Sequence, residues 1–135
     1  MALLVPDVGE VQLLSYALNK LTPENQIMRL FKNDYTPVEG SVLGDFTEAT
    51  WTGYAQKSLT GSSWTVATVA GVTTGTFAVQ TFTSTANQAA ELSYGYYVLG
   101  ATSGILLWAE RFTDGPYAIA VLGDNIAITP KITGA

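Results

Sequence analysis

The spacing of hydrophobic residues changes once along the chain, near residue 24. Before that point, apolar residues recur at the spacing of one helix face: Val11, Leu14, Leu18 and Leu21. With Asp7 as N-cap and Glu10 three residues later, the pattern predicts a helix over residues 8–20. The proline of "LTPEN" ends this helix, because a residue that precedes proline disfavours helical backbone.

Beyond residue 25, β-branched and aromatic residues come in short runs separated by Gly, Asp, Asn and Pro, a pattern typical of strands joined by turns. We predict about eight strands, over residues 26–33, 54–60, 63–69, 75–84, 93–100, 104–112, 116–122 and 125–132. The expected fold is mainly β, an antiparallel and jelly-roll-like β-sandwich over residues 25–135. An N-terminal arm and helix in residues 1–24 complete a single domain, because 135 residues normally build one core.

The sequence also predicts some of the connections between the strands. The stretch "SYGYYVLGATSGILLWAERF" predicts a long hairpin, since two apolar runs flank a turn with a glycine at each edge. The stretch "YAIAVLGDNIAITPKI" repeats this design, so we expect the last four strands to form an antiparallel meander. Pro130 lacks a backbone N–H and favours an edge position for the last strand. Residues 34–53 show little periodicity and predict a long loop or an irregular crossover.

The alternating runs also predict which side chains form the core. The apolar residues expected to be buried are Leu30, Phe77, Val79, Phe82, Val98, Leu106, Trp108, Ile119, Ile126 and Ile128. Trp108 is the largest of these side chains, so its loss should be the most costly.

The composition suggests that part of the surface contacts other subunits. Hydrophobic residues make up 47% of the chain and charged residues only 13%, about half the usual charged share. A surface so short of charge is typical of proteins that bury part of it in assemblies. We therefore expect a homo-oligomer.

Several function classes are disfavoured. A net charge of −5 with six basic residues leaves no basic stripe for nucleic acid. No segment approaches the roughly 20 apolar residues that a membrane helix needs. The opening "MALLVPDVGE" lacks the basic region and long apolar run of a signal peptide, so we expect synthesis in a cytoplasm without a cleaved leader.

The chain contains neither histidine nor cysteine, which removes the commonest general base and the triads built on Ser–His or Cys–His pairs. Only a carboxylate pair of the glycosidase type survives as a catalytic hypothesis, either Asp45 with Glu48 or Glu110 with Asp114. Carboxylates are common near turns, so we expect no enzyme and no cofactor.

A calcium site is a further hypothesis, because calcium prefers carboxylate and carbonyl oxygens. The acidic residues in or near glycine-containing loops are Asp34, Glu39, Asp45, Glu48, Asp114 and Asp124. They form no contiguous calcium-binding loop of the D-x-D-x-D-G kind, so we expect no bound metal.

The charged group in "LLWAERFTDGPY" has a structural interpretation as well. On a strand, Glu110 and Arg111 point to opposite faces and cannot act side by side as a catalytic acid and its partner. We expect both to be interfacial or paired across strands. Asp114, followed by Gly115 and Pro116, is typical of a turn.

Aromatic residues offer one alternative binding site. The set that could stack on sugars comprises Trp51, Tyr54, Trp64, Tyr94, Tyr96, Tyr97, Trp108 and Tyr117. Such residues more often fill a sheet core or a subunit interface. Trp51 and Tyr54 remain the candidate glycan-stacking pair of that alternative.

Several stretches of the chain resemble a known group of proteins. The segments "LFKNDYTP", "GDFTEATWTGYA" and "YGYYVLGATSGILLWAERFTDGPY" through "ITPKIT" are similar to small virion structural proteins of tailed phages and prophages. The resemblance spans most of the chain but includes no short functional motif, so no site residue follows from it.

The resemblance implies a capsid decoration (cement) protein that binds the outer capsid surface and stabilises the shell. Such a protein would be a trimer, assembled in the host cytoplasm and located in the virion, with the major capsid protein or another virion protein as partner. A tail-fibre, collar or glycan-binding receptor module is the alternative. For either role we predict that the arm and helix contact neighbours, and the candidate interface residues are Leu3, Leu4, Val5, Leu14, Glu110 and Arg111.

Overall fold

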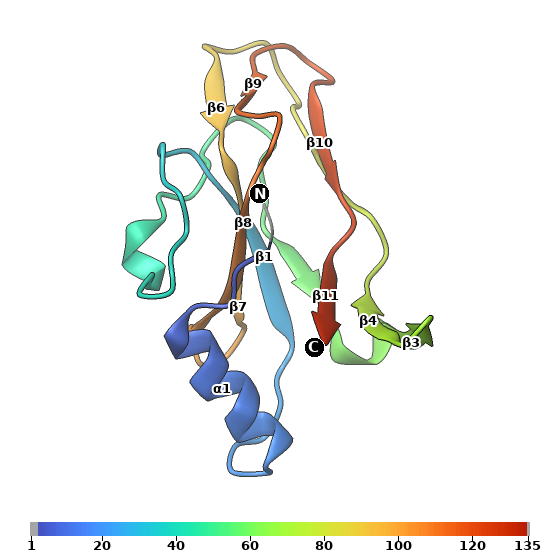
Figure 1. Ribbon diagram of the computed structural model, residues 1–135. Coiled ribbons are helices and arrows are strands. Elements are labelled where there is room, and N and C mark those ends of the chain that lie inside the picture. Colours follow the sequence, from blue (N-terminus) through green and yellow to red (C-terminus); the bar gives the residue numbers. More distant parts are fainter. Residues whose placement is uncertain (1–2, 135) are drawn as a thin grey trace.

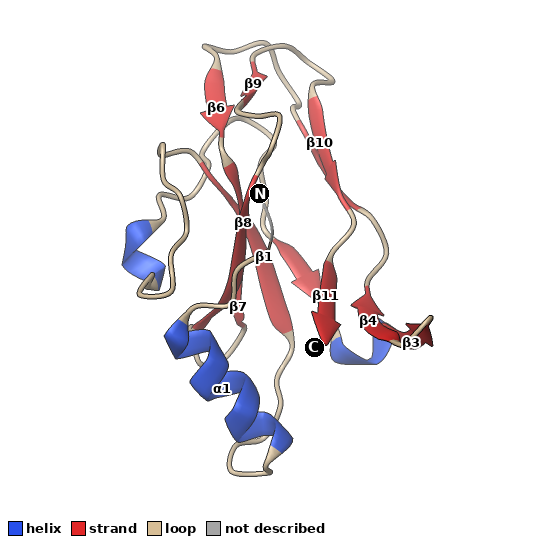
Figure 2. Cartoon of the chain, viewed as in Figure 1, coloured by secondary structure: helices blue, strands red, loops and turns tan. Residues whose placement is uncertain are grey.

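The computed structural model describes residues 3–134, and within them the protein is mainly β with one α-helix near the N-terminus, as predicted (Figures 1 and 2). The helix α1 spans Asp7–Ala17, and two 3₁₀ turns span Leu43–Asp45 and Gly61–Ser63. The strands are β1 Gln26–Phe31, β2 Lys57–Leu59, β3 Thr65–Val69, β4 Val72–Thr76, β5 Gln80–Thr83, β6 Glu91–Ser93, β7 Gly95–Gly100, β8 Leu106–Arg111, β9 Tyr117–Ile119, β10 Asn125–Ile128 and β11 Lys131–Gly134.

All strand pairs are antiparallel and they form a sandwich-like fold of several short sheets. The largest sheet has the order β2-β1-β7-β8, with β6 and β9 pairing beyond its end. The second layer contains β10 with β5 and the three-stranded sheet β11-β4-β3. A backbone bond of 3.0 Å from Phe77 N to the Pro130 carbonyl joins these two ladders into one long ribbon.

Two apolar clusters lie on opposite faces of the largest sheet. The larger cluster lies between this sheet and the second layer, and includes Met28 and Trp108 from one side and Phe82 and Ile126 from the other. The smaller cluster lies on the other face and is covered by the loop of residues 34–49 through Phe46. A sheet covered on both faces explains why β7 is buried along its whole length.

The core prediction is confirmed for every expected residue except Val79, which is 56% exposed. The predicted strand 75–84 is in fact interrupted between β4 and β5, and Val79 lies in that interruption. The predicted strand 125–132 is also split, into β10 and β11, with Pro130 between them. β11 lies at the edge of its sheet, as expected from the proline.

The hairpin of β7 and β8 is confirmed, but the predicted four-strand meander is wrong. β9 pairs with β6 and β10 pairs with β5, so neither adds to the outer edge of β8. That edge is already occupied, because Leu4 exchanges two backbone hydrogen bonds of 2.9 Å with Ala109. The N-terminal arm thus closes the sheet where the meander would have continued.

The alternation along β8 contains one irregularity that the sequence did not predict. Val98 is opposite Trp108 and Leu99 is opposite Leu106, so Leu107 is an extra residue in the ladder. Such a bulge breaks the strict alternation of faces. Leu107 and Trp108 consequently both contribute to the larger cluster, although they are consecutive.

The helix forms where it was predicted, with two differences at its ends. We expected Asp7 to be the N-cap residue, but Pro6 is the N-cap and Asp7 is the first helical residue. The helix ends at Ala17, three residues before the predicted end at residue 20. Gly9 faces the sheet, where a Cβ atom would overlap with the Leu107 carbonyl group, so glycine allows a close approach of α1 to β8.

Candidate assembly surfaces

The charged residues of "LLWAERFTDGPY" are all engaged within the chain. Tyr96 lies opposite Glu110 in the β7–β8 ladder and donates a hydrogen bond of 2.8 Å to its carboxylate. Burial and then the Glu110 carboxylate raise the pKa of the Tyr96 hydroxyl. Glu110 is therefore paired across strands, which is one of the two interpretations that the sequence left open.

Arg111 connects β8 to the loop that follows β1. Its guanidinium forms an ion pair of 2.6 Å with Asp34 and donates a hydrogen bond of 3.0 Å to the Tyr35 carbonyl. The guanidinium carbon also lies 5.2 Å from the centre of the Tyr94 ring. Arg111 thus fixes the start of the loop that covers the smaller cluster.

Two other acidic residues stabilise turns. Asp114 accepts a hydrogen bond of 2.5 Å from the Tyr117 hydroxyl, which lowers the pKa of Asp114 and raises that of Tyr117. Asp124 accepts bonds of 2.9 and 3.0 Å from the backbone N–H groups of Ala120 and Val121, and these donors lower its pKa. The prediction of a turn role for Asp114 is confirmed.

The predicted carboxylate pair of Asp45 and Glu48 is likewise engaged in local structure. Asp45 accepts a bond of 2.8 Å from Val42 N. Glu48 accepts a bond of 3.0 Å from the Tyr54 hydroxyl and lies 3.5 Å from the Arg29 guanidinium. Glu39, another calcium candidate, is exposed. Across residues 3–134, no three acidic side chains converge on a common point where a metal ion could bind.

The candidate sugar-stacking pair does not form an exposed platform. Trp51 is only 4% exposed and packs edge-on against Tyr54, with ring centres 5.5 Å apart. The Tyr54 ring stacks on Phe82, and its hydroxyl also accepts a bond of 3.1 Å from Leu30 N. Burial raises the pKa of this hydroxyl. Trp51 belongs to the core and the partly buried Tyr54 packs against it, so these two rings do not form the exposed stacking pair of that hypothesis.

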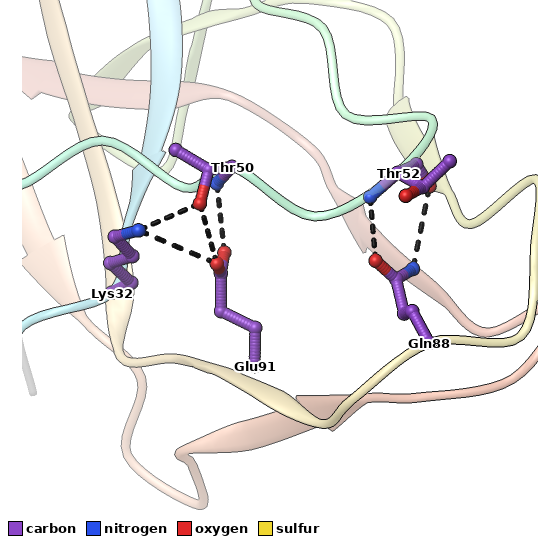
Figure 3. A network of polar contacts seen from close by, with 5 residues as sticks. All are labelled: Lys32, Thr50, Thr52, Gln88 and Glu91. Atoms are coloured by element: carbon purple, nitrogen blue, oxygen red, sulfur yellow. Dashed lines mark hydrogen bonds and ion pairs between the residues drawn. The ribbon is translucent and has the colours of Figure 1, made fainter.

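A polar network that sequence reasoning missed connects the loop before β2 to the start of β6 and to the segment just before it (Figure 3). Glu91 accepts bonds of 2.8 and 2.7 Å from the backbone and hydroxyl of Thr50, and lies 3.5 Å from the Lys32 ammonium. Gln88 accepts a bond of 2.7 Å from Thr52 N. Burial raises the pKa of Glu91, but the Thr50 donors and the Lys32 charge outweigh it and the pKa is lowered. The network fixes the positions of these loops relative to one another.

A second missed contact attaches the helix to the hairpin turn. Glu24 accepts a bond of 2.6 Å from the Tyr16 hydroxyl of α1, a bond of 2.9 Å from Ser103 N, and a bond from Thr102 N. Burial raises the pKa of Glu24, but bonds from Ser103 and Tyr16 outweigh it and hold the pKa at about 2, below its usual 4.5. The partners are far apart in sequence, so no local pattern could have revealed this contact.

Replacing Glu24 with glutamine should lower the melting temperature at neutral pH and remove part of the acid sensitivity. A carboxyl whose pKa falls on folding stabilises the protein above its unfolded pKa, and this contribution disappears as pH falls from about 4.5 to about 2. Thermal unfolding of both proteins at pH 7 and at about pH 2 measures the effect. The difference should shrink at the lower pH, whereas Glu39→Gln, which removes the same charge from an exposed loop, should change little at either pH. A constant difference between wild type and Glu24→Gln would contradict this role.

The structure places the predicted arm residues on their own subunit. Leu3 and Val5 pack against the larger cluster, and Leu4 pairs with β8. Met1 and Ala2 of "MALLV" lie outside the described residues. The arm therefore completes the fold of its own chain, and Leu14 is the expected interface residue whose side chain is largely exposed, at 60%.

Leu14 belongs to a larger apolar surface, which we call the N-terminal apolar face. Its members are the exposed residues Val8, Val11, Leu14, Leu18, Leu21 and Ile105. An open depression of ≈ 310 Å³ lies among Val8, Val11 and Ile105. Helices of soluble proteins normally turn their apolar side to the core, so an apolar series that faces outward indicates a surface for a partner.

A second apolar surface lies at the other side of the molecule, on the hairpin of β3 and β4, which projects from the body of the protein (Figure 1). Val66 and Val69 are 71% and 75% exposed, and Val72 in β4 is also exposed. No charged residue occurs between Lys57 and Glu91. The described residues thus carry two separate apolar surfaces and no group of three or more carboxylates that could hold a metal ion.

The sequence matches no protein-family model and has no significant match among curated proteins. Among residues 3–134, no helix is both long and apolar enough to cross a membrane.

Proposed function

We propose that this protein is a structural subunit of a tailed-phage or prophage virion, namely a capsid decoration protein that binds the outer shell as a homo-oligomer, most simply a trimer. The supporting observation is the N-terminal apolar face, where a helix exposes its hydrophobic series to solvent. The candidate catalytic carboxylates are bound within the chain, so the proposal assigns them no reaction. The virion location rests on the sequence resemblance.

The N-terminal apolar face would be the docking element. Burying a large exposed aliphatic side chain gains roughly 1.5–3 kcal/mol, before the costs of association are subtracted. A few such residues give only a modest affinity per subunit. On a capsid, many copies and the linkage within each oligomer add avidity, so modest contacts are sufficient to coat and stabilise a shell.

The proposal is tested with purified capsids that lack this protein. Deleting residues 1–20 would be a poor test, because Leu3, Val5 and Gly9 pack against the body of the chain. The double variant Leu14→Asp and Leu18→Asp changes only exposed side chains and should fold normally while losing capsid binding.

Co-sedimentation with capsids measures the amount bound per capsid. The matched control is the double variant Val38→Asp and Val42→Asp, which introduces the same two charges at exposed aliphatic residues outside both apolar surfaces and should bind as wild type does. Full occupancy by the Leu14→Asp, Leu18→Asp variant would exclude the N-terminal apolar face as the docking element. If the wild-type protein itself did not bind capsids, a tail-fibre, collar or receptor-binding role would replace the decoration role.

A further inference from the structure

The strand β3 is an open sheet edge. It is the last strand of the order β11-β4-β3, so one of its sides has no neighbouring strand among the described residues. All five of its residues are exposed, and its pairing with β4 is regular from Thr65 to Val69 without a bulge. An edge of this kind presents a row of backbone N–H and C=O groups that can pair with another strand.

The other edges of the two larger sheets carry features that prevent such pairing. The outer side of β8 is covered by the pairing of Leu4 with Ala109. The edge strand β2 contains Lys57, and the edge strand β11 contains Lys131. Lysines and covering segments are common protections of sheet edges. β3 contains no charged residue and no proline, and no other strand among residues 3–134 pairs with its outer side, so it is the unprotected edge of these two sheets.

We propose that β3 pairs antiparallel with β3 of a second copy of this chain. The occupant follows from charge: each chain carries a net charge of −5, but none of it lies between Lys57 and Glu91, so two copies can approach here without local repulsion. A two-fold axis satisfies both open edges at once. The result is a continuous sheet in the order β11-β4-β3-β3-β4-β11 across the two copies.

The sequence of β3 suits pairing with itself. With the axis at the central residue, Ala67 lies opposite Ala67, Thr65 opposite Val69, and Val66 opposite Thr68. Each cross-strand pair then joins β-branched residues or small alanines, which are compatible neighbours in a sheet. No pair places like charges together. The strand ends at Val69, and Ala70 and Gly71, with positive φ values of 50° and 80°, form the tight turn into β4.

This contact goes beyond the proposed function and does not depend on a capsid. It lies on a surface separate from the N-terminal apolar face, so a β3 pair can link subunits that belong to different trimers. Five paired residues form a small interface, so association through β3 should be weak and concentration-dependent in solution.

The absence of cysteine from the chain makes a disulfide test direct, because a single introduced cysteine is the only thiol. Residues directly opposite in an antiparallel pair have Cα atoms about 4.5–5.5 Å apart, which lies within disulfide range. Ala67→Cys should therefore form a covalent dimer under mild oxidation. The matched control is Ala127→Cys, an exposed alanine in β10. We expect crosslinking at residue 67 to be at least about tenfold faster than at residue 127.

An independent variant removes the pairing without a thiol. Ala67→Lys places two like charges directly opposite each other in the proposed pair, at a position exposed in the single chain. The variant should therefore keep the wild-type melting temperature. It should also lose the concentration-dependent rise in mass that we expect for the wild type in sedimentation. Equal crosslinking rates at residues 67 and 127, or unchanged association of Ala67→Lys, would overturn the proposal. Neither experiment uses capsids, so such results would not contradict the proposal that the protein docks on capsids through α1.

Discussion

Replacing Trp108 with alanine should lower the free energy of unfolding by about 3–5 kcal/mol. Trp108 is 3% exposed, lies in the middle of β8 opposite Val98, and packs edge-on against Trp64 with ring centres 6.2 Å apart. Alanine would leave a cavity between the two layers of the fold. Because whole domains are stable by only about 5–15 kcal/mol, this variant should be close to unfolded at moderate temperature. Urea denaturation measures the loss.

Two further variants serve as controls for the cavity that Trp108→Ala would create. The indole N–H of Trp108 is buried and has no hydrogen-bond partner among residues 3–134, so Trp108→Phe removes no hydrogen bond to this part of the chain and should cost far less than alanine. Val66→Ala removes an exposed apolar side chain of β3 and should change stability by less than about 0.5 kcal/mol. A Trp108→Ala protein with the wild-type melting temperature would show that Trp108 is not part of the core.

Replacing Gly95 with alanine should destabilise the protein by about 3 kcal/mol, the upper part of the range for overpacking. A Cβ atom at this position would overlap with the Glu110 carbonyl oxygen and would lie 2.6 Å from the Phe31 ring. The carbonyl belongs to the β7–β8 ladder and the ring lies in the smaller cluster, so neither can move freely. Thermal unfolding of the variant gives the loss directly.

Gly44→Ala is the matched control, because a Cβ atom there would meet no other residue of the described part of the chain within 4 Å, its two chain neighbours aside, and the backbone needs no positive φ. This control should unfold within a few degrees of the wild type. Equal stability of Gly95→Ala and Gly44→Ala would contradict the close approach of Phe31 in β1 and Glu110 in β8 to Gly95 in β7.

The alternation of apolar residues was sufficient to predict the mainly β fold and nine of its buried apolar residues, although others, such as Met28, Leu59 and Tyr97, were not predicted. It succeeded where a strand has one buried face, as in β10, where Ile126 and Ile128 are buried and Ala127 is exposed. It failed for Val79, because no local pattern marks the interruption between β4 and β5. The bulge at Leu107 is similarly invisible, since an extra residue changes the faces without changing the sequence pattern.

The pairing of strands depended on contacts that are distant in sequence. The meander was a reasonable prediction from consecutive turns, but the outer edge of β8 is taken by Leu4, a residue from the other end of the chain. The same limitation explains why Glu24 was missed, since its partners are Tyr16 and the turn at Ser103. Short-range patterns carry no information on such pairs.

The candidate site residues were likewise predictable where their contacts are local in sequence. The turn role of Asp114 was predictable because its partner Tyr117 is three residues away. For Trp51, the favoured interpretation as a core residue agrees with its burial, although residues 34–53 form an irregular segment whose pattern did not mark which of its side chains point inward. The helix spacing correctly marked Leu14 as part of an apolar series, but only the structure shows that this series faces away from the sheet.

The mass of the purified protein by light scattering, alone and mixed with capsids that lack it, tests the central claim most directly. The proposed decoration role predicts a stable trimer that saturates the capsids at a stoichiometry fixed by the lattice. A monomer that does not bind capsids at any concentration would contradict it.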